Sequence, residues 1–201
     1  MINHKHKFIF VRVAKTASTS ILLRLFNDTQ NSIRAIQNRY LIDVSEYWDG
    51  DRNHYPLGII KKVVPIKIYN NYFKFGFVRN PWARAVSAYH YSINWYNWRP
   101  SKEPPKTLAT FKTWLSSLKP LDKYCNQYTF VEGCDFIGKV ENLQEDFNII
   151  CDKIGIPRQE LPHKNKTKHK HYTEHYDEET RKIVAEKFAK DIEYFGYKFG
   201  E

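Results

Sequence analysis

Short apolar runs alternate with amphipathic segments along the chain. The first run, KFIFVRV (7–13), is almost continuously apolar, as a buried parallel strand is, and STSILLRLFND (18–28) spaces its apolar residues as a helix does. Two further strand-and-helix pairs are predicted, at 71–80 with 81–96 and at 134–141 with 142–155. Strands that alternate with helices predict an α/β fold built on a parallel sheet.

Further helices are predicted where proline, acidic residues and glycine mark the ends of periodic segments. Pro56 opens a short helix over 56–64, and Asp177 is an expected N-cap for a long final helix that stops at Gly196. The charged faces of that final helix are interpreted as solvated surface. A further helix is predicted over 106–118, and the helix over 142–155 is predicted to end at Gly155. Residues 29–53 are predicted to be mostly loop with one possible strand. The predicted architecture is a P-loop-like parallel sheet covered by helices on both faces, in a single domain spanning 1–201.

The composition is that of a globular protein, with 42% hydrophobic residues. Apolar runs fall short of the roughly 20 residues that a membrane helix needs, so no membrane span is expected. Arg12 and Lys15 interrupt the first apolar run, which argues against a signal peptide. The three cysteines are widely spaced and form no metal or disulfide pattern, so a cytoplasmic location is expected.

Basic residues outnumber acidic ones by 32 to 22, which gives a formal net charge of +10. A basic chain attracts polyanions such as nucleic acid, anionic polysaccharide or phosphorylated ligands, and the charge alone does not choose among them. Much of the excess lies in HKNKTKHKHY (163–172), which we interpret either as a basic loop over an anionic ligand or as a solvated linker.

The stretch from Ala14 to Ser20 joins the first strand to the first helix and has the composition of an anion cradle. Lys15 offers a point charge, small residues permit close approach, and hydroxyls can donate hydrogen bonds at a helix N-terminus. The Walker A pattern GxxxxGK[ST] is absent, because there is no glycine and the lysine precedes the small residues. An ordinary helix start capped by Ser or Thr is the alternative.

A second stretch, FGFVRNPWARAVSAY (75–89), repeats this arrangement. Arg79 ends a buried strand, Pro81 begins a helix, and Ser87 lies two turns into it. An arginine binds phosphate through its planar fork. Two such sites suggest a ligand with two separated anionic groups. The alternative is that Arg79 pairs with a buried carboxylate, and Arg84 is equally compatible with a structural role.

These motifs resemble those of the sulfotransferases that use 3′-phosphoadenosine-5′-phosphosulfate (PAPS). RVAKTASTS and FKFGFVRNPWARAVSAY look like the two nucleotide-binding motifs, and the closer resemblance is to sulfotransferase family 2, which includes heparan and uronosyl 2-O- and chondroitin sulfotransferases. The resemblance continues through DFIGKVENLQEDFNIICDKIGI, LPHKNKT and HYDEETRKIVAEKFAKDIEYFGY, from 8 to 197. Two departures are Ala14 in place of a proline, and a short acceptor region between the motifs.

The resemblance implies PAPS as donor, a carbohydrate or other hydroxyl as acceptor, and neither metal nor nucleic acid as a partner. Arg79 and Ser87 would hold the 3′-phosphate. The residues implied for the 5′-phosphosulfate are Lys15, Thr16, Ala17, Ser18, Thr19 and Ser20, and the tentative contacts in the basic stretch are Lys166, Thr167 and Lys168.

His54 is the candidate general base, because histidine suits proton transfer near neutral pH. It lies between the two motifs and before a short helix, as the base histidine does in similar enzymes, and Lys15 would stabilise charge on the bridging oxygen as the sulfuryl group leaves. A surface or capping role is the alternative for His54.

The aromatic tip that ends with Trp95, Tyr96, Trp98 and Arg99 is a hypothetical acceptor-binding lip, with core packing as the alternative. Two other functions remain open at this point. A P-loop-type phosphotransferase would turn over ATP with magnesium. A basic module for RNA or anionic polysaccharide would bind polyanions in a salt-dependent way without Lys15 or Arg79.

Overall fold

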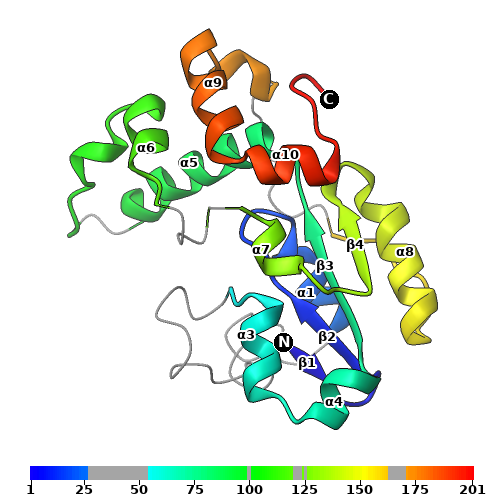
Figure 1. Ribbon diagram of the computed structural model, residues 1–201. Helices are drawn as coiled ribbons and strands as arrows, with labels where there is room; N and C mark the ends of the chain where they lie inside the picture. Colours follow the sequence, from blue (N-terminus) through cyan, green and yellow to red (C-terminus); the bar gives the residue numbers. More distant parts are fainter. Residues whose placement is uncertain (27–53, 99–100, 120–123, 125, 163–170) are drawn as a thin grey trace. The chain divides into compact units, whose positions relative to one another are not determined.

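The computed structural model describes residues 1–26, 54–98, 101–119, 124, 126–162 and 171–201 (Figure 1). Within these residues one sheet has the strand order β1 (Ile2–Asn3), β2 (Phe8–Val11), β3 (Phe73–Val78) and β4 (Phe136–Lys139). Strands β2, β3 and β4 are parallel, which confirms the predicted parallel sheet. The edge strand β1 pairs antiparallel with β2 and was not predicted, because two residues carry no periodicity.

Contacts divide the chain into two compact units. The first comprises 1–78 and 129–166, and the second comprises 79–128 and 167–201. The chain leaves the first unit directly after β3, whose last residue is Val78, and Arg79 begins the second unit.

One face of the sheet is packed with phenylalanine side chains. Phe10 of β2 stacks on Phe75 of β3 with ring centroids 5.1 Å apart, and both rings are fully buried. Helices α1 (Ser18–Leu25) and α8 (Leu143–Ile154) bury their apolar residues in the same cluster. Helix α8 follows a short 3₁₀ turn, η2 (Val140–Asn142), and ends as predicted at Gly155, whose left-handed φ of 70° suits glycine.

The opposite face of the sheet is covered by other helices of the first unit. A methyl group at Gly76 of β3 would lie 2.8 Å from Cγ1 of Val131 in α7 (Tyr128–Val131), so that helix packs directly on the strand. After α7, Gly133 approaches Leu57 of α3 (Leu57–Val63), which α4 (Ile66–Asn71) follows in the chain. Helices therefore cover both faces, as predicted.

The second unit is helical in its described residues. Its long helix α5 (Pro81–Asn97) begins at the predicted proline and contacts α6 (Phe111–Ser117), α9 (Glu178–Lys187) and the 3₁₀ turn η3 (Tyr172–His175). Asn80 caps α5 by accepting a hydrogen bond from the backbone N–H of Trp82 at 3.1 Å. The last helix, α10 (Ala189–Phe195), ends at Gly196, whose φ is 69°.

Two predicted helices are each divided in the structure. The segment 106–118 consists of the 3₁₀ turn η1 (Lys106–Leu108) and of α6, because Thr110 caps a new helix by accepting a hydrogen bond from Thr113 N. The segment 177–196 is broken at the buried residue Phe188, while Asp177 is the N-cap as predicted. The interpretation of 29–53 as mostly loop with one possible strand concerns residues outside the described part of the chain.

Candidate active site

The turn after β2 has the backbone geometry of an anion-binding nest. Lys15 and Ala17 have positive φ values of 68° and 56°, whereas Thr16 between them does not. Alternation of this kind turns successive backbone N–H groups toward one side, where they can surround an anion. A left-handed conformation costs a non-glycine residue about 1–2 kcal/mol. A strained backbone conformation persists only where the surrounding fold holds it in place, and such conformations are concentrated at functional sites.

The start of α1 differs from an ordinary capped helix. Its N-cap is Ala17, which makes no side-chain hydrogen bond to the first turn. The buried hydroxyl of Thr16 donates to the carbonyl oxygen of Val13 at 3.0 Å and so braces the turn. The hydroxyl proton of Thr16 is therefore used within the turn, and its backbone N–H is the group it could offer to an anion. Ser18 and Ser20 lie buried at the helix start, and Thr19 is half-buried.

His54 lies against this turn although it is distant in sequence. Its Nδ1 is 3.0 Å from the carbonyl oxygen of Arg12, the first residue after β2. A carbonyl only accepts, so Nδ1 donates, which places the lone pair of a neutral imidazole on Nε2. Arg12 is buried. The hydrogen bond thus places His54 against a backbone carbonyl three residues before Lys15 in the sequence.

From Arg79 onward, the second motif lies in the second unit. Arg79 is half-buried and directly precedes the capped start of α5, and Ser87 is half-buried in the second turn of that helix. Arg84 is 2% exposed and donates from Nη1 to the carbonyl oxygen of Tyr124 at 3.2 Å. Arg84 therefore makes a structural contact inside the unit.

A buried polar network behind Arg79 was missed by sequence reasoning. Gln127, which is fully buried, accepts a hydrogen bond from Arg79 N at 2.9 Å and donates to Arg79 O at 2.8 Å. Asp191 of α10 is also fully buried and accepts from Gln127 N and Tyr128 N. Its burial raises the pKa of the Asp191 carboxyl.

The burial of Asp191 corrects the interpretation of the final helix as charged, solvated surface. In sequence, Asp191 stands in KDIEYF and looks like any charged helix position. Its role depends on N–H groups more than 60 residues earlier in the chain. The structure divides this segment into two helices at Phe188, and no local sequence pattern predicts that division.

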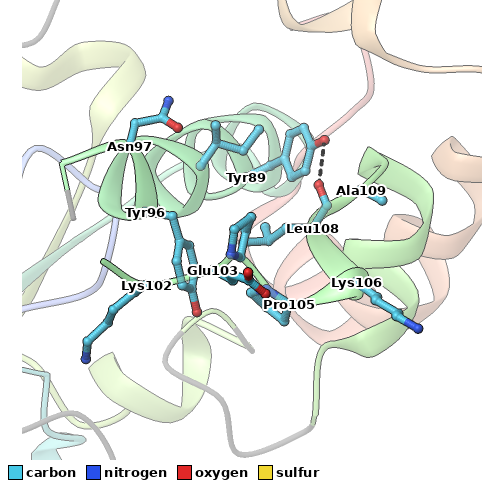
Figure 2. Close-up of a pocket in the computed structure, with 11 residues that line it drawn as sticks. Tyr89, Tyr96, Asn97, Lys102, Glu103, Pro105, Lys106, Leu108 and Ala109 are labelled. Carbon is cyan, nitrogen blue, oxygen red and sulfur yellow. Dashed lines mark hydrogen bonds between the residues drawn. The ribbon is translucent and has the colours of Figure 1, made fainter. Parts of the chain in front are cut away.

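The aromatic segment of α5 lines a pocket of about 690 Å³ within the second unit. Figure 2 shows the ring of Tyr96 extending from α5 toward the segment that carries Lys102 and Glu103, with Lys106 pointing away. Tyr89 donates a hydrogen bond to the carbonyl oxygen of Leu108 at 3.3 Å and so closes one end. The lining residues are Tyr89, Ile93, Tyr96, Asn97, Lys102, Glu103, Pro104, Pro105, Lys106, Leu108 and Ala109.

The residues of the hypothetical aromatic lip differ in their surroundings. Trp98 is 67% exposed, and Trp95 contacts Tyr96 edge-on at 4.8 Å while Lys102 Nζ lies 5.4 Å from its ring centroid. Tyr96 itself lines the pocket. Arg99, the last member of the proposed lip, lies outside the described residues.

The tentative contacts Lys166, Thr167 and Lys168 also lie outside the described part of the chain. In the described ranges, no group of three or more His, Cys, Asp or Glu side chains is arranged to hold a metal ion. None of the helices in that part is both long and apolar enough to cross a membrane. Cys134 and Cys151 have free thiols, and burial raises the pKa of Cys134 to about 12.

Comparison with known proteins assigns the chain to a family. An uncharacterized protein of Archaeoglobus fulgidus is 33% identical over 107 residues, which span 52% of this chain and 85% of the relative. A sulfotransferase from Alicyclobacillus acidocaldarius aligns in structure over 93% of this chain and 92% of its own, with 16% identity and a TM-score of 0.45. Residues 1–198 match the sulfotransferase family, so almost the whole chain is covered. The chain belongs to the sulfotransferase family.

Proposed function

We propose that this sulfotransferase transfers a sulfuryl group from PAPS to a hydroxyl of a carbohydrate. Family membership supports the transfer. The observation that carries the proposal further is the hydrogen bond from His54 to the Arg12 carbonyl, because it orients an imidazole beside an anion-binding turn. A base next to an anion cradle is what transfer from an anionic donor to a neutral hydroxyl requires.

The proposed donor contacts follow the two motifs. The backbone N–H groups of the Lys15–Ala17 turn and the start of α1 hold the 5′-phosphosulfate, together with Ser18, Thr19 and Ser20. Arg79 and Ser87 hold the 3′-phosphate. Lys166, Thr167 and Lys168 supply further contacts to the nucleotide in this proposal.

The proposed reaction is an in-line displacement at sulfur. The acceptor oxygen forms a bond to sulfur while the bond from sulfur to the bridging phosphate oxygen breaks. Nε2 of His54 takes the proton of the acceptor hydroxyl, and 3′-phosphoadenosine-5′-phosphate (PAP) leaves with the bonding electron pair. The Lys15 ammonium stabilises the charge that develops on the bridging oxygen.

Calorimetric binding of PAP without magnesium tests the donor site and needs no knowledge of the acceptor. Each charge-assisted contact contributes about 1.5–3 kcal/mol, so Arg79→Ala or Lys15→Ala should weaken PAP by about tenfold or more. Arg158→Ala is the matched control, because it removes one positive charge from an exposed ion pair with Asp152. Equal binding by all variants would overturn the donor assignment and favour a general polyanion-binding module.

The pocket beside α5 supports a carbohydrate as the acceptor. A tyrosine face at Tyr96 can stack on a sugar ring, and Asn97 and Glu103 can hydrogen-bond to its hydroxyl groups. In a screen of oligosaccharide acceptors, Tyr96→Ala should raise the acceptor KM and leave PAP affinity unchanged. Transfer only to non-carbohydrate hydroxyls would contradict this part of the proposal.

A further inference from the structure

The side chain of Gln127 holds the backbone of Arg79 at both of its polar groups. Oε1 accepts from Arg79 N at 2.9 Å, and Nε2 donates to Arg79 O at 2.8 Å. One primary amide therefore pairs with both groups of a single residue, as a neighbouring strand would. With its N–H and its C=O both held, the φ and ψ angles of Arg79 are fixed, and so is the direction in which its side chain leaves the backbone.

Asp191 holds this amide in turn. Its Oδ2 accepts from Gln127 N at 2.8 Å and from Gln127 Nε2 at 3.2 Å, and its Oδ1 accepts from Tyr128 N at 2.9 Å. Gln127 and Asp191 are both fully buried. The contact between Nε2 and the carboxylate also determines which end of the amide is the donor, because a carboxylate oxygen accepts.

The residue after Arg79 is fixed independently. Asn80 is fully buried, accepts from Trp82 N and donates from Nδ2 to the carbonyl oxygen of Lys198 at 2.9 Å. Arg79 is thus the half-exposed residue between β3 and a buried cap. Burying polar side chains costs desolvation free energy unless they are hydrogen-bonded, and here the buried amide of Gln127 makes its hydrogen bonds to the backbone of this half-exposed arginine.

We propose that Gln127 and Asp191 are positioning residues for recognition of the nucleotide 3′-phosphate. They touch no ligand themselves and act by holding the Arg79 guanidinium in a phosphate-binding direction. This inference rests on the proposed PAPS donor. It predicts that loss of the Gln127 amide weakens discrimination at the 3′ position and leaves recognition of the 5′ half of the nucleotide intact.

The experiment compares the affinities for PAP and 5′-AMP, which differ only in the 3′-phosphate. Wild type should bind PAP more tightly by about tenfold or more, and Arg79→Ala should abolish that preference. Gln127→Leu should reduce the preference for PAP by about tenfold and leave the affinity for 5′-AMP unchanged. In the double variant with Arg79→Ala, the Gln127→Leu change should not lower the PAP affinity any further. Gln127→Met is similar in length and volume, carries no amide, and serves if the leucine variant does not fold.

A matched control separates positioning from general destabilisation. Thr180→Val removes a hydroxyl that hydrogen-bonds to Asp177 in the same unit, far in the chain from Arg79, and should keep the wild-type preference for PAP. If wild type and Arg79→Ala behave as expected while a folded Gln127 variant keeps the full preference, the inference is wrong and the donor site stands. If wild type shows no preference for PAP, the proposed 3′-phosphate site itself is wrong.

Discussion

His54 and Arg12 are joined by a hydrogen bond between Nδ1 of the imidazole and the backbone carbonyl, at 3.0 Å and across 42 positions of sequence. The bond attaches the segment before α3 to the end of β2. It also selects the tautomer in which Nε2 is the basic nitrogen. The Arg12 carbonyl thus helps to fix both the orientation and the tautomer of the candidate base.

The asparagine variant of His54 should separate positioning from catalysis. In His54→Asn the amide Nδ2 can replace Nδ1 as donor to the Arg12 carbonyl, but the basic Nε2 is gone. Loss of a general base slows transfer by about 10²–10⁴-fold. We expect that loss in turnover, with unchanged PAP affinity by calorimetry and unchanged thermal stability. A variant with wild-type turnover would exclude His54 as the base.

The buried hydroxyl of Thr16 should matter more for the turn than its methyl group. Thr16→Val preserves shape but leaves the Val13 carbonyl without this donor, which costs about 1–3 kcal/mol of unfolding free energy. Chemical denaturation should show that loss, and PAP affinity should fall with it because the nest loses its brace. Thr16→Ser retains the hydroxyl and serves as control; equal PAP affinity in the two variants would show that the hydrogen bond does not shape the site.

Two glycine-to-alanine changes should have opposite effects on stability. A methyl group at Gly138 in β4 would lie 2.5 Å from Cε1 of Phe77, a fully buried ring, so overpacking should cost about 1–3 kcal/mol. Gly58 in α3 is exposed with open space around it, so alanine there should stabilise the fold by about 0.5–1 kcal/mol. Denaturant titrations of both variants measure the difference. A harmless Gly138→Ala would contradict the close packing of β3 and β4.

The cap of α9 should make stability depend on pH at the acid end. Hydrogen bonds from the Thr180 side chain and backbone lower the pKa of Asp177 below its ordinary value of 3.8. A carboxyl with a lowered folded pKa stabilises the fold above its unfolded pKa, and that contribution is lost as the pH falls through the folded value.

Asp177→Asn keeps a capping side chain that does not titrate. Melting temperatures of wild type and variant, measured from pH 6 downward, should therefore differ most at pH 6 and converge below pH 3.8, the ordinary value. A constant difference across that range would show that the charge of Asp177 plays no part in the cap.

Local signals were sufficient for the elements that carry the motifs. The apolar run before Lys15, the proline at position 81 and the glycines at 155 and 196 act through backbone preferences that neighbouring residues determine. These predicted β2, the start of α5 and the ends of α8 and α10. The strand-to-helix turn with its small residues was recognisable for the same reason.

Tertiary structure decided which distant groups meet. Nothing near His54 specifies the Arg12 carbonyl, and nothing near Asp191 or Gln127 specifies the Arg79 backbone. Periodicity tells which side of a helix is apolar, but a buried carboxylate in a polar helix looks like surface until its hydrogen-bond donors arrive from another segment. The amino-acid sequence therefore determined the strand-to-helix turn and its lysine, whereas packing decided how the candidate base His54 and Arg79 are held. The physical reason is that buried polar groups are stable only where the complete fold supplies their hydrogen bonds.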